Sequence, residues 1–127
     1  MNNGNILEGQ DISKTFHGGF GGRSYQALSH VDIHLSQGET LGLMGPSGCG
    51  KSTLCRILLR LIHPDKGTVL FDGEDITHAH GKDLLSFRRR VQLISQRPES
   101  FFDPRLKLGV SILEPLSFSQ LDKKEGK

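Results

Sequence analysis

The chain has 127 residues, of which 35% are hydrophobic and 24% charged, and its formal net charge is +2. This length allows at most one ordinary domain, the composition argues against overall disorder, and the balanced charge predicts no nucleic-acid partner. No apolar run approaches the roughly 20 residues of a membrane-spanning helix. The first residues carry no secretory signal, so we expect a cytoplasmic protein in which Cys49 and Cys55 remain thiols.

Two strands joined by a glycine-rich loop are predicted at the start of the chain. Apolar residues are scattered between residues 6 and 16, and residues 17–22 contain four glycines, which is typical of a loop. From residue 31 to residue 35, apolar and polar residues alternate. This period of two predicts a half-buried strand.

The segment that follows predicts a strand, a loop and a helix in succession. Residues 40–44 are apolar without alternation, as in a strand that is buried on both faces of a parallel sheet. One face of a helix is then marked by apolar residues at helical spacing, namely Leu54, Ile57, Leu58 and Leu61. Proline and glycine within residues 63–67 end this predicted helix.

The rest of the chain predicts shorter elements. Strands are expected at residues 68–71 and 91–95, and helices at residues 83–89 and 106–113. Pro115 is expected to stop the last helix. The three arginines at 88–90 are expected to form a solvated helix end.

A phosphate-binding loop is predicted between the buried strand and the first helix. The pattern G-x-x-x-x-G-K-[ST] is matched by Gly45, Pro46, Ser47, Gly48, Cys49, Gly50, Lys51 and Ser52. Its glycines let backbone N–H groups turn inward as an anion nest at the N-terminus of a helix. The pattern arises by chance in about half a per cent of chains of this length, and here it has the strand and helix that it requires. We therefore expect it to bind nucleotide phosphates.

Four side chains of this region have separate expected roles. Lys51 brings its positive charge to the outer phosphates, the Ser52 hydroxyl is a ligand for Mg²⁺, and Thr53 adds a hydrogen bond. Cys49 supplies its backbone, and its thiol is expected to face the site, where alkylation would compete with nucleotide.

From about residue 6 to residue 116 the sequence resembles the ATP-binding subunit of ABC transporters. Residues 35–39 and 41–54 are similar to the family's entry strand and Walker A motif, and residues 67–73 to the next strand and turn. Residues 91–96 resemble the strand that leads into the Q-loop. The subgroup that imports peptides and nickel is resembled at Pro98, Ser100, residues 103–105 and residues 114–116.

The resemblance implies roles for two further residues. Gln96 would be the Q-loop glutamine, whose amide senses Mg²⁺ and the attacking water and whose loop touches the membrane subunits. The family stacks an aromatic ring on adenine, and Phe16 matches the place of that ring. Tyr25, which is nearer to the phosphate loop in sequence, is the alternative, and either ring has a buried core position as its simpler explanation.

The implied fold is α/β, a P-loop NTPase core with an N-terminal antiparallel β subdomain. Residues 1–127 would be the N-terminal part of the ATP-binding domain, truncated before the helical signature subdomain. Residues 35–39 only superficially resemble the family's signature. Residues 69–72 only superficially resemble Walker B, because Asp72 is followed by Gly73 and the segment matches the strand after the first helix, so the signature and Walker B are both expected to be absent. None of the histidines matches the switch histidine, and His78 and His80 are expected to be solvated rather than a nickel site.

The expected function is therefore ATP and Mg²⁺ binding with negligible hydrolysis by this chain, in an importer of peptides, nickel or a related solute. The implied partners are membrane-spanning permease subunits, a second ATP-binding subunit and, indirectly, a solute-binding protein, at the inner face of the cell membrane. One alternative is a non-hydrolysing remnant or interaction module that docks on a permease. Another is a small P-loop kinase, for which the arginines at 88–90 are the only lid candidates.

Overall fold

The computed structural model describes residues 4–18, 22–96 and 103–117. For residues 115–117 it describes the backbone alone. It divides into two units, Met1–Gln92 and Leu93–Lys127. The first unit contains a sheet and two helices, and the second contains helix α3 (Leu108–Ser117). None of the helices in these ranges is long and apolar enough to span a bilayer.

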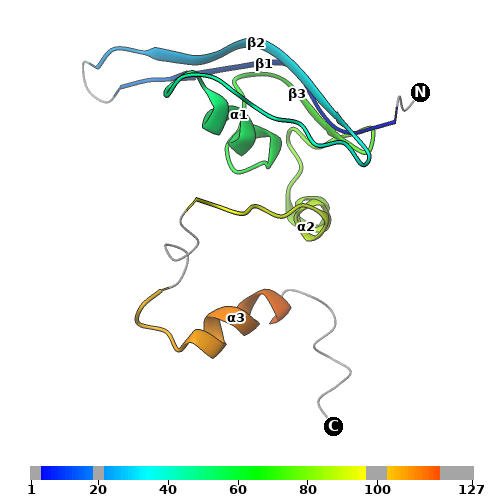
Figure 1. The fold of residues 1–127 in the computed structure, drawn as a ribbon, viewed down its shortest axis with the longest axis vertical. Helices are drawn as coiled ribbons and strands as arrows, with labels where there is room; N and C mark the ends of the chain where they lie inside the picture. Colours follow the sequence, from blue (N-terminus) through cyan, green and yellow to red (C-terminus); the bar gives the residue numbers. More distant parts are fainter. Residues whose placement is uncertain (1–3, 19–21, 97–102, 118–127) are drawn as a thin grey trace. The chain divides into compact units, whose positions relative to one another are not determined.

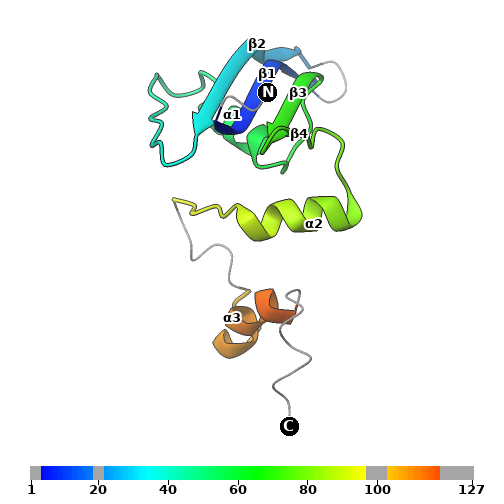
Figure 2. The ribbon, with the colours of Figure 1, turned by 90° about the vertical axis from the view of Figure 1, so that its right-hand side faces the viewer.

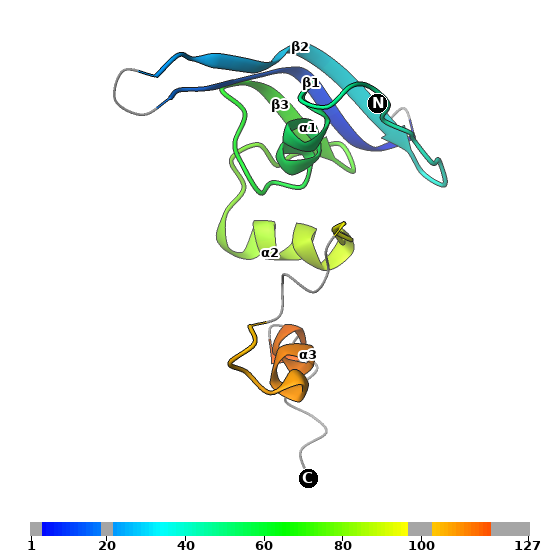
Figure 3. The ribbon, with the colours of Figure 1, turned by 60° about the vertical axis from the view of Figure 1, so that its left-hand side comes forward.

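The first unit is built on an antiparallel sheet with the strand order β2-β1-β3-β4 (Figure 1, with β4 labelled in Figure 2). Its strands are β1 (Asn5–Phe16), β2 (Tyr25–Ser36), β3 (Lys66–Phe71) and β4 (Glu74–Asp75). The strands predicted around residues 6–16, 31–35 and 68–71 are thus confirmed, as is the antiparallel subdomain. The β1–β2 pairing continues to Phe16 and Tyr25, beyond the last β1–β3 pair, so this end of the hairpin extends past β3 (Figure 3).

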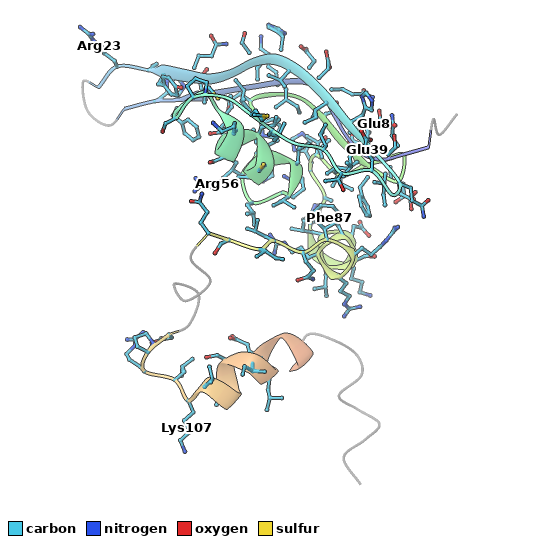
Figure 4. The ribbon with its side chains drawn as sticks, viewed as in Figure 1. Glu8, Arg23, Glu39, Arg56, Phe87 and Lys107 are labelled. Carbon is cyan, nitrogen blue, oxygen red and sulfur yellow. The ribbon has the colours of Figure 1, made fainter. Side chains whose placement is uncertain are left out.

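Helices α1 (Lys51–Leu58) and α2 (Gly81–Arg90) lie on the same side of this sheet (Figure 2). Buried apolar residues from the strands and both helices form the core, namely Ile12, Leu28, Leu54, Ile57, Leu58, Val69, Phe71, Ile76 and Phe87. Phe87 projects from α2 toward the sheet (Figure 4), where its ring meets that of Phe71 edge to face at 5.0 Å between centroids. This apolar packing attaches α2 to β3.

The end of α1 differs from the prediction because Arg60 adopts a left-handed backbone conformation, with φ at 54°. The helix therefore stops at Leu58, before residues 63–67, and Leu61 is half exposed instead of lying on the buried face. Arg60 itself is buried, and its guanidinium donates from Nε to the Ile76 carbonyl at 2.5 Å and from Nη2 to the Ala79 carbonyl at 3.2 Å. Burial lowers the pKa of this guanidinium.

Two predicted strands and both predicted ends of the last helix are wrong. Residues 40–44 and 91–95 form no strand, and Met44 and Ile94 are 96% and 90% exposed. Both segments have the composition of parallel-sheet strands, but no strand in the described ranges pairs with them, and backbone pairing is what forms a strand. Helix α3 begins later than predicted and continues two residues past Pro115, since a proline in the last turn removes only one intrahelical hydrogen bond.

Candidate phosphate-binding site

The predicted phosphate loop lies directly before α1 in the first unit. Gly50 is the N-cap residue of this helix, with φ at 97° and no side-chain cap. A Cβ atom at Gly50 would lie 2.5 Å from the Ala27 carbonyl oxygen and 2.9 Å from Leu28 Cδ2, both on β2. Only glycine fits this backbone conformation at this distance from β2, so the strand fixes where the loop enters the helix.

The Lys51 ammonium closes over the loop that precedes it. Its Nζ donates to the carbonyl oxygens of Gly45 and Pro46, each at 2.7 Å, and lies 3.5 Å from Cys49 Sγ. A primary ammonium has three donors and can exchange neutral carbonyl partners for anionic phosphate oxygens, which form shorter and stronger hydrogen bonds. The thiol of Cys49 is exposed beside this ammonium.

The first turn of α1 supplies the other polar groups. Its leading N–H groups have no partner within the helix, and Gly50 contributes no side chain to cap them. Ser52 is exposed and Thr53 half-buried in this turn. This end of a helix favours anions through its N–H groups and its dipole.

The residues present fit an Mg²⁺ ion that takes few of its ligands from the protein. Magnesium in nucleotide sites takes few protein ligands and completes its shell with waters and substrate phosphates, so the exposed Ser52 hydroxyl suits one position. Within the described ranges no group of three or more histidine, cysteine or acidic side chains is arranged to hold a metal. His78 instead stacks on His63, with ring centroids 6.1 Å apart.

The two candidate aromatic residues, Phe16 and Tyr25, are directly opposite each other at the end of the β1–β2 hairpin. Their exposed fractions are 43% and 54%, so neither ring is buried in the core. The Tyr25 hydroxyl donates to the Gly48 carbonyl at 2.5 Å, whereas the Phe16 ring carries the Lys14 ammonium at 5.8 Å from its centroid. Both rings remain candidates for the base.

Asp65 holds the Lys14 side chain beside this pair of rings. Its carboxylate accepts hydrogen bonds from Lys14 Nζ and from the Thr15 N–H, each at 2.7 Å. These two donors keep the pKa of the Asp65 carboxyl below its usual range, with the bond from Lys14 as the largest cause. This ion pair holds the Lys14 ammonium next to the Phe16 ring.

The first unit thus brings together all predicted site residues except Gln96. Gln96 is exposed in the second unit, and the structure assigns it no position relative to the loop. The residues Pro98 and Ser100 lie outside the described residues. Sequence reasoning missed the part that Ala27 and the Tyr25 hydroxyl play in seating the loop, because contacts between β2 and the loop have no signature in residue spacing.

Known proteins resemble this chain over most of its length. The ABC transporter family matches residues 28–123. The glutathione import ATP-binding protein GsiA of Pectobacterium atrosepticum is 49% identical over 74% of this chain and 15% of its own length. The nickel import ATP-binding protein NikE of Pseudomonas putida is 45% identical over 72% of this chain and 33% of its own length. The oligopeptide transport ATP-binding protein OppF of Streptococcus mutans is 36% identical over 93% of this chain and 38% of its own length. The chain therefore spans well under half of each of these relatives.

Solved structures agree with the sequence comparisons. A dimeric bacterial ABC transporter cassette matches 89% of this chain with a TM-score of 0.72 and 28% identity, and the match covers 47% of that cassette. A dimeric post-hydrolysis state of an ATP-binding cassette, bound to ADP and phosphate, matches 66% of this chain and 35% of its own chain, with a TM-score of 0.59 and 31% identity. The chain therefore belongs to the ABC transporter family, and its fold is that of part of an ATP-binding cassette.

Proposed function

We propose that this chain binds ATP together with Mg²⁺ and serves as ATP-binding component of an importer for peptides, nickel or a related solute. The observation that carries the proposal is the loop before α1, where the Lys51 ammonium lies on the Gly45 and Pro46 carbonyls and the first helical turn begins without a side-chain cap. The solute class follows the relatives, which are named for the import of glutathione and nickel and for oligopeptide transport.

In this proposal the loop binds the triphosphate by positioning and electrostatics. Phosphate oxygens would replace the Gly45 and Pro46 carbonyls as acceptors for Lys51, and the first-turn N–H groups of α1 would hold a second set of oxygens. Ser52 would hold Mg²⁺, which neutralises phosphate charge when bound. Thr53 would donate one further hydrogen bond, and Phe16 would stack on the base.

Hydrolysis by this chain alone is proposed to be negligible. Phosphoryl transfer requires a carboxylate for the metal and a group that orients water. The 127 residues contain no Leu-Ser-Gly-Gly-Gln signature and no Walker B aspartate followed by glutamate, since Asp72 lies in a segment similar to the strand after the first helix and is followed by Gly73. We propose that Ser52 and Gln96 contact Mg²⁺ and that Gln96 also contacts the attacking water, and neither residue supplies a carboxylate.

The proposed setting is the inner face of the cell membrane. ATP-binding subunits of importers act on membrane-spanning permease subunits, and we propose that the loop around Gln96 touches such a partner. The two cassettes described above are dimeric, which supports a second ATP-binding subunit as partner. A solute-binding protein would take part only indirectly.

Binding of Mg-ATP by the purified chain tests the proposal, with Lys51→Ala as the disabling variant. Loss of charge-assisted hydrogen bonds is expected to weaken ATP binding about 10- to 100-fold in titration calorimetry. Lys82→Ala, which removes an exposed lysine from α2, is the matched control and is expected to bind like the parent chain. Equal affinity of the Lys51→Ala variant and the parent chain would overturn the proposal.

Phosphate release tests the hydrolytic part separately. We expect no steady release from the pure chain with saturating Mg-ATP. Steady release that Lys51→Ala abolishes would show that the chain hydrolyses ATP by itself and would contradict this part, while leaving the binding proposal intact.

A further inference from the structure

We propose that Tyr25 is a positioning residue that holds the phosphate loop through its hydroxyl, and that it leaves the base to Phe16. The inference rests on the proposed function and deepens it. Tyr25 Oη donates to the Gly48 carbonyl oxygen at 2.5 Å, across 23 positions of sequence. This is the hydrogen bond that links the middle of the loop to β2.

The hydrogen bond fixes the orientation of the peptide between Gly48 and Cys49. All peptide bonds of the described residues are trans, so the Cys49 N–H points away from the carbonyl that Tyr25 holds. That N–H is directed at the Pro46 carbonyl oxygen, 3.4 Å from the nitrogen, and Lys51 Nζ donates to the same oxygen at 2.7 Å. Two donors therefore converge on one oxygen on the side opposite Tyr25, which is the arrangement that a phosphate oxygen needs.

A second contact with β2 lies a short distance along the same strand. Gly50 approaches Ala27 and Leu28 so closely that a Cβ atom has no room. The loop is thus attached to β2 at its middle through Tyr25 and at its end through Gly50. With both points fixed, the N–H groups between them keep their direction before a ligand arrives, and such preorganisation lowers the entropic cost of binding.

The two rings at the end of the hairpin differ in a way that separates their roles. Tyr25 is committed to the loop through its hydroxyl, whereas the opposing Phe16 has no polar atom and remains 43% exposed. The Lys14 ammonium lies over Phe16, at 5.8 Å from the ring centroid. The flat ring is partly exposed beside this ammonium, and we infer that its exposed part stacks on the base.

Comparison of ATP with inorganic tripolyphosphate, which has no base, separates these roles. Tyr25→Phe keeps the ring and removes the hydroxyl, so it is expected to weaken the binding of ATP and of tripolyphosphate by the same factor, about 2- to 10-fold. Phe16→Leu is expected to weaken ATP and leave tripolyphosphate unchanged. Unchanged binding of both ligands by Tyr25→Phe, or loss of ATP binding alone, would overturn the inference.

Two measurements without nucleotide keep this inference distinct from the proposed function. Circular dichroism of Tyr25→Phe is expected to match the parent chain, and the Cys49 amide resonance is expected to shift while that of the distant Gly38 stays in place. An unmoved Cys49 resonance in a chain that binds ATP overturns the role of Tyr25 and leaves the proposed function standing. A shifted resonance in a chain that binds neither ligand supports the role of Tyr25 and overturns the proposed function.

Tyrosine emission gives an independent signature of the loop. The chain has one tyrosine and no tryptophan, so its ultraviolet emission reports on Tyr25 alone. Tripolyphosphate is expected to change this emission in the parent chain and in Phe16→Leu, because the loop contacts the hydroxyl. Emission that does not respond while tripolyphosphate binds would contradict the inference.

Discussion

Strand β3 and residues 40–44 are both short apolar segments, yet only β3 forms a strand. Strand β3 pairs with β1 on one side and with β4 on the other, and Val69 in its middle is fully buried. Residues 40–44 pair with no strand in the described ranges, although Leu41 and Leu43 line a groove of about 340 Å³ with apolar side chains of β1, β2 and α1. The comparison shows that an apolar segment can place side chains against other apolar side chains without forming a strand. A strand also needs a neighbouring strand to accept and donate its backbone hydrogen bonds.

Amide hydrogen exchange is expected to show the largest difference between the two segments. The Val69 N–H donates to Thr77 Oγ1 at 2.8 Å in the buried core, so its exchange is expected to be about 1,000-fold slower than in an unfolded peptide. The amides of Leu41 and Leu43 are expected to exchange close to the unfolded rate. Strong protection of both leucine amides in the pure chain would show that this segment finds a pairing partner in solution.

A pair of glycine substitutions probes the same contrast through stability. A Cβ atom at Gly67, at the start of β3, would lie 2.5 Å from the carbonyl oxygens of both Gln10 and Asp11, and φ there is 94°. Gly67→Ala is therefore expected to lower the free energy of unfolding by about 3 kcal/mol. Gly42→Ala adds a methyl group with no atom within 4 Å, and it is expected to change the free energy of unfolding by less than about 0.5 kcal/mol.

Urea denaturation of the two alanine variants measures this difference. If the Gly67 variant were as stable as the parent chain, the close approach of β3 to β1 would be incorrect. If the Gly42 variant were strongly destabilised, residues 40–44 would be packed more tightly than the structure shows.

A smaller effect than that of Gly67→Ala is expected from Asp65, which directly precedes β3 and links it to β1. Hydrogen bonds from Lys14 and Thr15 depress the pKa of Asp65 in the folded chain. Its stabilisation is therefore fully present above the unfolded pKa of about 3.9 and is lost as the pH falls through the lower folded value. Because the pair is partly exposed, Asp65→Asn is expected to cost less than about 1 kcal/mol at pH 7.

Denaturation of the Asp65→Asn variant at pH 7 and pH 2 checks the sign. The difference from the parent chain is expected to shrink between pH 7 and pH 2, because the stabilisation by the carboxylate is lost as the pH falls through its lowered pKa. A difference that persists unchanged in acid would mean that Asp65 acts through packing and not through its charge.

Elements with local signals were predictable from the sequence. The helical spacing of Leu54, Ile57 and Leu58 and the alternation at residues 31–35 specify elements that form from neighbouring residues or a hairpin. Residues 40–44 and 91–95 were predicted wrongly because a parallel strand depends on distant segments that the spacing of one strand does not reveal.

The site divides in the same way. The pattern at residues 45–52 identified the loop, the helix start and Lys51, since all of them lie within one continuous segment. The contacts of that loop with Tyr25 and Ala27 depend on how β2 packs against it, more than 20 residues earlier in the chain. No periodicity encodes such a contact, so the sequence predicted Tyr25 only as an alternative aromatic residue for stacking on the base.

Arg60 joins the end of α1 to the segment before α2 through hydrogen bonds whose acceptors acid does not protonate. Its guanidinium binds the carbonyl oxygens of Ile76 and Ala79, which do not titrate, whereas the bond between Lys14 and Asp65 requires a carboxylate. A guanidinium stays protonated at every pH in which the chain is handled. When acid protonates Asp65 and weakens the link between β1 and the start of β3, the hydrogen bonds from Arg60 to Ile76 and Ala79 keep their acceptors.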